Sequence, residues 1–320
     1  MYQSKILSML MVLLAAGAVQ AQDAAPAAGG SATMESEIFQ QAEAGQSQVT
    51  VFVPYRMLET TAKGAATSTK VTGLYRLGAQ YEYGINEMFS AGAKLSYTMT
   101  KSDGNPETKF QGLEYPELFL KGRMPMDFGR LRYGLNLAFA PMKGKAKVVN
   151  GAITEAPAPT ERSGAIDLTP YVGFDMDAGP GVAGARLMYQ LGIGESTTET
   201  DISISTPIVA NTTVDVKNQS GNVLTLTGFY EYFLSDMLLG AGLNYAMIGE
   251  GTTKTPGLFG GAATETKSKT LSLIGVDLYA RIPTGPVELV PALSYWTKSS
   301  ADDYDKYNDM YLSIAGRFNF

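Results

Sequence analysis

The chain has 320 residues, a formal net charge of −6, and neither cysteine nor histidine. The lack of cysteine excludes disulfides and thiol chemistry, and the lack of histidine excludes Ser-His-Asp hydrolysis and imidazole metal sites. The acidic balance makes nucleic acid an unfavourable partner. We therefore expect a protein that is not an enzyme and that uses no cofactor or metal.

Residues 1–21 predict a cleavable secretory signal peptide. Lys5 precedes an apolar run from Ile6 to Leu14, and small residues then lead to Ala21. The run is shorter than the roughly 20 residues of a membrane-spanning helix, which disfavours a membrane anchor. We therefore expect an exported protein.

Residues 22–47 predict a flexible leader. Residues 22–30 are rich in Ala, Pro and Gly, which is typical of a flexible linker. Residues 31–45 begin with a possible Ser or Thr cap, continue with acidic residues and end in Gly, a pattern that predicts one short helix. The sequence leaves open whether this helix lies in the periplasm or inside the domain that follows.

From residue 48 onward, apolar and polar side chains alternate with a period of two, which predicts β-strands. Each strand reaches the roughly 9 to 11 residues that a tilted strand needs to cross a bilayer. The expected twelve strands cover residues 48–60, 69–84, 89–100, 110–126, 131–142, 165–176, 182–193, 222–234, 238–248, 270–282, 287–297 and 307–320. A shorter hairpin is expected at residues 201–205 and 212–216, so fourteen strands is the alternative.

The connections between these strands alternate between two kinds. Short turns are expected near residues 85–88, 127–130, 177–181, 235–237 and 283–286. Longer loops are expected near residues 61–68, 101–109, 143–164, 194–221, 249–269 and 298–306. This alternation of loop lengths is not expected in a soluble β-sandwich. A transmembrane barrel has it, because tight turns join its strands at one end and long loops join them at the other.

The last strand, Tyr311-Leu-Ser-Ile-Ala-Gly-Arg-Phe-Asn-Phe320, alternates apolar and polar residues and ends on an aromatic residue. With the signal peptide and the hairpin rhythm, it resembles bacterial outer-membrane β-barrel proteins. The likeness covers residues 48–320 and is architectural, because no motif selects one porin or transporter family.

This resemblance implies an all-β, antiparallel, up-and-down barrel in the outer membrane of a Gram-negative bacterium, with short periplasmic turns and long extracellular loops. Lipid and lipopolysaccharide would surround it. It also implies that Phe318 and Phe320 form the signal that the barrel-assembly machinery reads, with periplasmic chaperones as further partners during biogenesis.

Three prolines, Pro116, Pro170 and Pro291, fall inside predicted strands. Because each one removes a ladder hydrogen bond, we expect bulges or strand ends there.

The more apolar parity of the strands predicts the face toward lipid, and the opposite parity predicts the lumen. The predicted lumen charges are Arg76, Glu82, Lys94, Lys121, Arg123, Arg132, Asp167, Asp175, Arg186, Glu231, Asp277, Arg281, Glu288 and Arg317. These charges either pair and fill the lumen or set the ion preference of a pore. A barrel of about 12 strands lies between filled small barrels and open porins, so any pore is expected to be narrow. Residues 34–45 or the loop at 194–221 could narrow it further.

Two functions fit this pattern. The first is an outer-membrane channel for passive diffusion of small hydrophilic solutes or ions. The alternative is a non-conducting surface protein with a structural, adhesion or recognition role. The oligomeric state stays open. Asp302, Asp303 and Asp305 could bind a divalent cation beside lipopolysaccharide, although an exposed acidic loop is more often solvated.

Overall fold

The computed structural model describes residues 36–103, 107–139, 144–150, 152–157, 165–204, 210–257, 262–301 and 303–320. The predicted signal peptide and residues 22–35 of the predicted leader lie outside these ranges. Within them, the structure contains no helix that is long and apolar enough to span a membrane.

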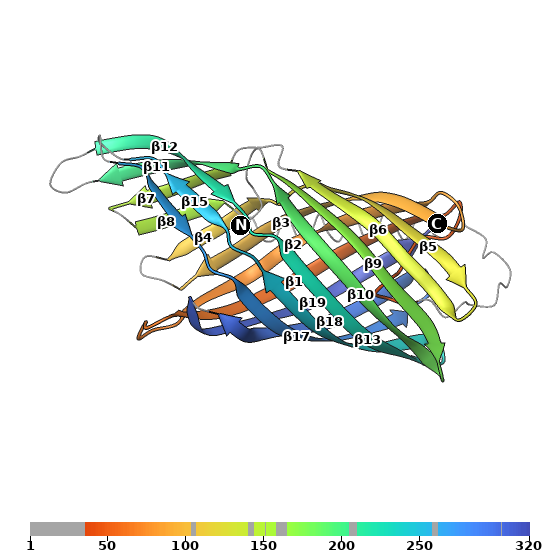
Figure 1. The fold of residues 1–320 in the computed structure, drawn as a ribbon. Coiled ribbons are helices and arrows are strands. Elements are labelled where there is room, and N and C mark those ends of the chain that lie inside the picture. Colours follow the sequence, from red (N-terminus) through yellow and green to blue (C-terminus); the bar gives the residue numbers. More distant parts are fainter. Residues whose placement is uncertain are drawn as a thin grey trace.

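Twelve strands in the described part of the chain form one closed antiparallel ring (Figure 1). In order around the ring they are β1 (Ser47–Ala62), β2 (Thr69–Gly84), β3 (Phe89–Ser102), β5 (Glu117–Met126), β6 (Gly129–Phe139), β9 (Ile166–Ala178), β10 (Gly181–Ile193), β13 (Val223–Leu234), β14 (Met237–Ile248), β17 (Leu271–Pro283), β18 (Val287–Ala301) and β19 (Tyr304–Asn319). The last strand, β19, pairs back to β1 from Gln48↔Asn319 to Ala62↔Tyr304, so the ring has no free edge. The predicted twelve-stranded barrel is confirmed.

Seven further strands of the described residues continue the wall beyond the ring: β4 (Thr108–Leu113), β7 (Gly144–Val149), β8 (Ala152–Pro157), β11 (Ser196–Ile204), β12 (Ala210–Gln219), β15 (Thr252–Thr255) and β16 (Thr264–Lys267). Figure 1 shows them gathered at one end, which we call the loop end. The opposite end, where tight turns join the strands, is the turn end, and the carboxy-terminus lies there.

The hairpin of β11 and β12 lies outside the ring because β10 pairs directly with β13, from Gly181↔Tyr232 to Gln190↔Val223. The alternative count of fourteen strands is therefore wrong. Parallel pairing of β11 with β7 and of β4 with β8 joins the long loops to one another. In this extension, a hydrogen bond from Lys254 lowers the pKa of the Glu195 carboxyl.

The three strand prolines have different consequences. Pro116 lies in the break between β4 and β5, as expected. Pro170 and Pro291 lie inside the continuous strands β9 and β18. The ladder skips pairs beside each of them but keeps its register on both sides. The expected bulge or strand end is therefore wrong at these two positions, because a strand can lose one hydrogen bond while its flanking pairs hold the register.

Large apolar side chains are exposed on the outer face of the ring. Leu95, Leu243 and Ile274 are 51%, 70% and 49% exposed. Their neighbours of opposite parity, such as Ser96 and Asn244, are buried. An apolar outer face with polar residues inside is the pattern of a barrel that is surrounded by lipid.

Candidate functional site: the barrel lumen

Residues 36–46, which we call the lumen segment, lie inside the ring near the turn end. The backbone amides of Glu37 and Ile38 donate to the Glu231 carboxylate at 3.1 and 3.3 Å, and the amide of Ala42 donates to Glu82 at 3.0 Å. The segment contains turns and no helix. The described part of the predicted helix over residues 31–45 therefore does not form, because lumen carboxylates take these amide donors.

Cations of the barrel wall hold the same segment. Arg317 donates to the Glu37 carboxylate with both terminal nitrogens, and its Nη1 also lies 3.0 Å from Glu288 Oε2. Lys121 Nζ donates to the carbonyl of Gln40 at 2.8 Å and to Glu82 Oε2 at 2.6 Å. Charge-assisted hydrogen bonds of this kind are roughly twice as strong as neutral ones.

Phe39 anchors the centre of the lumen segment. Its ring meets Phe229 edge to face at a centroid distance of 5.6 Å, and the Arg132 guanidinium lies 5.8 Å from its centroid. A Cβ atom at Gly173 would lie 2.2 Å from the ring. Glycine at position 173 therefore makes room for the Phe39 ring against β9.

The contacts of the lumen segment come from all around the ring. They involve strands β2, β5, β6, β9, β13 and β19. A segment that contacts so many strands of a closed ring must cross its interior. The lumen is therefore narrowed at the turn end by the chain's own residues.

A buried ion pair lies beside Phe39. Arg132 Nε is 3.1 Å from Asp175 Oδ1, and both side chains are almost fully buried. Arg130 adds a contact of 3.2 Å to the same carboxylate. On the far side of the segment, a cavity of about 650 Å³ opens at the turn end, lined by Glu43, Ala44, Glu87, Met88, Arg123, Pro125, Arg130 and Arg132.

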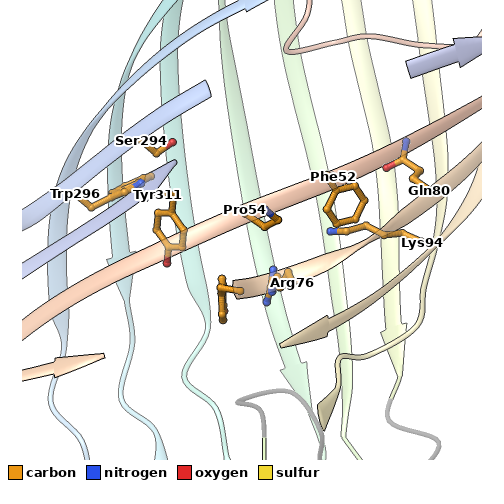
Figure 2. Close-up of a pocket in the computed structure, with 9 residues that line it drawn as sticks. Phe52, Pro54, Arg76, Gln80, Lys94, Ser294, Trp296 and Tyr311 are labelled. Atoms are coloured by element: carbon orange, nitrogen blue, oxygen red, sulfur yellow. The ribbon is translucent and has the colours of Figure 1, made fainter. Parts of the chain in front are cut away.

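A second cavity, of about 540 Å³, lies at mid-barrel, nearer the loop end than the lumen segment (Figure 2). We call it the mid-barrel cavity. It is lined by Phe52, Pro54, Tyr75, Arg76, Gln80, Lys94, Ser294, Trp296 and Tyr311. These residues come from β1, β2, β3, β18 and β19, so the cavity lies against the seam where the ring closes.

The chain is similar to the COG4313 outer membrane channel from Pseudomonas putida F1, with a TM-score of 0.60 and 10% sequence identity over 90% of this chain and 100% of that chain. The chain has the fold of an outer-membrane β-barrel. The predicted resemblance is confirmed at this level.

The chain is also similar to a deletion mutant of the TodX monoaromatic hydrocarbon channel, with a TM-score of 0.50 and 11% identity over 87% of this chain and 91% of that chain. No protein-family model and no curated protein sequence matches the chain. At such low identities the likeness concerns the fold alone.

The barrel places the predicted lumen charges in separate groups. Those around the lumen segment and its neighbouring ion pairs are Glu82, Lys121, Arg132, Asp175, Glu231, Arg281, Glu288 and Arg317. Arg76 and Lys94 line the mid-barrel cavity, and Arg123 lines the cavity at the turn end. Asp277, on β17, accepts a hydrogen bond from Ser294 of the mid-barrel cavity, and Asp167 and Arg186 lie on β9 and β10, apart from these groups.

Sequence reasoning missed other charged and aromatic residues of the barrel interior. Arg56 forms a bidentate pair with Asp309 at 2.9 and 2.8 Å. Asp309 shares the parity of Arg317 in the last strand, so extending that parity along the strand would have found it. Glu37 carried no strand signal because it precedes the first strand.

The two aromatic residues of the predicted assembly signal differ in exposure. Phe320 is 47% exposed, and its backbone exchanges hydrogen bonds with Ser47 at 2.9 and 2.8 Å. Phe318 is buried and pairs with Val49 and Val287 on either side. Both residues therefore lie at the closing seam of the barrel.

The predicted acidic loop is only partly described, because Asp302 lies outside the described residues. Asp303 accepts a hydrogen bond from the amide of Lys269, and Asp305 accepts one from the amide of Gly64, both at 2.9 Å. Among the residues that the structure describes, no group of three or more acidic side chains is arranged to hold a metal ion.

Proposed function

We propose that this protein is a channel in the outer membrane of a Gram-negative bacterium. It lets small hydrophilic solutes or ions diffuse through the barrel, and the lumen segment narrows the path at the periplasmic end. The observation that carries this proposal is a closed ring with cavities on both sides of a narrowing that is not part of the wall.

The lumen segment is attached in a way that allows it to move without opening the ring. Beyond the side-chain contacts, it meets the wall through an isolated bridge between Ala44 and Gly84 and a hydrogen bond from Gly45 to the Gly84 carbonyl. Gly45 has a φ of +76°, a conformation that glycine adopts at no steric cost. Displacing the segment therefore breaks no pairing between barrel strands.

The surroundings of the channel follow from its outer face and its seam. Membrane lipid and lipopolysaccharide would contact the exposed apolar side chains. In this proposal, the barrel-assembly machinery and periplasmic chaperones recognise the seam residues Phe318 and Phe320 before the barrel closes. The similar structures support the channel role, since their names describe an outer membrane channel and a monoaromatic hydrocarbon channel.

Planar-bilayer recordings on refolded protein test the channel directly. We expect discrete conductance steps and a reversal potential that moves toward cation preference in Arg76→Glu, because this side chain is 40% exposed in the lumen. Arg132 is a poorer probe, since Arg132→Glu would bury a second carboxylate against Asp175. Lys145→Glu, in the extension outside the ring, is the matched control, with an unchanged reversal potential expected.

A specific observation favours the alternative of a non-conducting surface protein: the lumen segment crosses the interior and its charges are paired. The same recordings separate the two functions. Silence across many insertions of correctly folded protein would contradict the channel and leave the surface role.

A further inference from the structure

The mid-barrel cavity combines two kinds of side chain. Phe52, Tyr75, Trp296 and Tyr311 supply aromatic rings, and Arg76 and Lys94 supply cations. Figure 2 shows Phe52, Arg76, Lys94, Trp296 and Tyr311 around one space, which Tyr75 also lines. Among the described residues that line the cavity, none is acidic. A ligand in this space therefore meets aromatic rings and positive charge.

Arg76 is brought to the cavity by a bulge in β2. The register of β2 shifts between Leu74 and Leu77 against β3. Arg76 has a φ of +60°, which is rare for a residue other than glycine and is typical of functional sites. The bulge places Tyr75 and Arg76, two consecutive residues, on the lumen side together.

The Arg76 guanidinium is incompletely satisfied. Its Nε lies 3.9 Å from Glu114 Oε2, too far for a hydrogen bond. Within the described residues this buried nitrogen has no hydrogen-bond partner. The guanidinium also lies 5.3 Å from the centre of the Tyr75 ring. The side chain as a whole is 40% exposed, so its terminal nitrogens, and not the buried Nε, are the donors that an acceptor on a ligand would meet.

Four carboxylates of the described residues lie near the cavity without lining it, and one of them, Asp277, accepts a hydrogen bond from the lining residue Ser294 at 2.5 Å. Glu114 is 2% exposed and accepts a hydrogen bond from Thr98. Asp309 is bound by both nitrogens of the Arg56 fork. Glu117 is 3.2 Å from Lys94 Nζ, which itself lies 5.4 Å from the centre of the Phe52 ring. These acids balance the charge of the wall without repelling an anion inside the cavity.

The aromatic rings are held in fixed positions. A Cβ atom at Gly275 would lie 2.6 Å from the Trp296 indole, so the indole lies against the wall of β17 over this glycine. Tyr311 is fixed by a hydrogen bond of 2.7 Å from its hydroxyl to Asp309. Rings that are already ordered lose little entropy when a flat ligand stacks on them.

We propose that the mid-barrel cavity binds a small aromatic carboxylate. The ring of the ligand stacks among Trp296, Tyr311 and Phe52, and its carboxylate accepts hydrogen bonds from Arg76 with Lys94 nearby. Guanidinium and carboxylate match in geometry, and the volume of about 540 Å³ is in the range of small-molecule sites. This proposal rests on the proposed function in one respect: it names the aromatic carboxylate as a solute that the channel would carry.

Trp296 is the chain's single tryptophan, so its fluorescence reports on this cavity alone. We would titrate the purified full-length barrel in detergent with phenylacetate, with neutral phenylacetamide and with non-aromatic cyclohexylacetate. We expect a saturable change with phenylacetate and binding at least about tenfold weaker for the other two compounds. Equal affinity for phenylacetamide, or no saturable change with phenylacetate, would overturn the proposal.

Arg76→Gln assigns the carboxylate contact. We expect phenylacetate to bind this variant at least about tenfold more weakly, while Lys145→Gln in the extension binds as the unmodified protein does. If heat-modifiable migration shows that Arg76→Gln does not fold, Lys94→Gln and the comparison of the three compounds still test whether the cavity binds the carboxylate. Conductance without phenylacetate binding would overturn the proposed binding site but not the proposed channel. Phenylacetate binding without conductance would overturn the channel but not the binding site.

Discussion

At the scale of single residues, Arg76 and Asp309 show which lumen positions the alternation of side chains along a strand can predict. Parity alone predicted Arg76 as a lumen residue, but the bulge that turns Tyr75 inward beside it has no sequence signal. Asp309 lies on a regular strand, so parity could have predicted it. Residue positions are therefore predictable where the ladder is regular and unpredictable where the register shifts.

Gly173 offers a test of the lumen segment that removes no polar group from the protein. In Gly173→Ala, the added methyl would lie 2.2 Å from the Phe39 ring and 2.8 Å from the Ala185 carbonyl oxygen of the wall, so the ring, as the more mobile partner, must move. Overpacking of this kind costs about 1 to 3 kcal/mol, which raises the undocked population by about fivefold to 150-fold. We expect more frequent openings to a larger conductance in single-channel recordings.

Gly228→Ala is the matched control for this substitution. Gly228 is also a strand glycine, but a Cβ atom there would meet nothing within 4 Å. We expect its recordings to match those of the unmodified protein. If Gly173→Ala gave the same recordings as Gly228→Ala, Phe39 would not hold the segment in place.

At the scale of elements, alternation predicted the twelve strands of the ring but not most strands of the extension. The ring strands bury one face and expose the other, so their period of two is visible in the sequence. The four-residue strands β15 and β16 are too short to show a period. The pairing of β4 with β8 and of β7 with β11 joins loops that are distant in the sequence, which local patterns do not encode.

At the scale of elements, the pairing of β1 with β19 at the closing seam gives a prediction about barrel assembly. Deleting Phe320 removes two backbone hydrogen bonds to Ser47 and the last aromatic side chain of the strand. We expect a clear loss of heat-modifiable, membrane-inserted barrel in cells. Phe128→Ala is the control, because Phe128 is an exposed aromatic residue in a turn, and it should assemble normally. Equal assembly of the two variants would remove Phe320 from the assembly signal.

At the scale of the whole molecule, the barrel could be predicted from the sequence and the narrowing of its lumen could not. The alternating pattern of a barrel is repeated in every strand, so an error in predicting one strand does not change the predicted fold. The lumen segment is held by partners far along the chain, such as Glu231, 193 and 194 residues away, and Arg317, 280 residues away. No local pattern predicts such pairing, which is why the sequence left the place of residues 34–45 open.

The proposed channel is narrowed by its own lumen segment. The most direct test compares single-channel conductance in planar bilayers for refolded chains that begin at residue 22, at residue 36 and at residue 43. The first two keep the lumen segment, whereas the third lacks its contacts to Glu231, Arg317 and Glu82. We expect equal, small conductance for the first two and a several-fold larger conductance for the third. Equal conductance in all three would show that the lumen segment does not narrow the path, and no conductance from the folded third chain would contradict the channel.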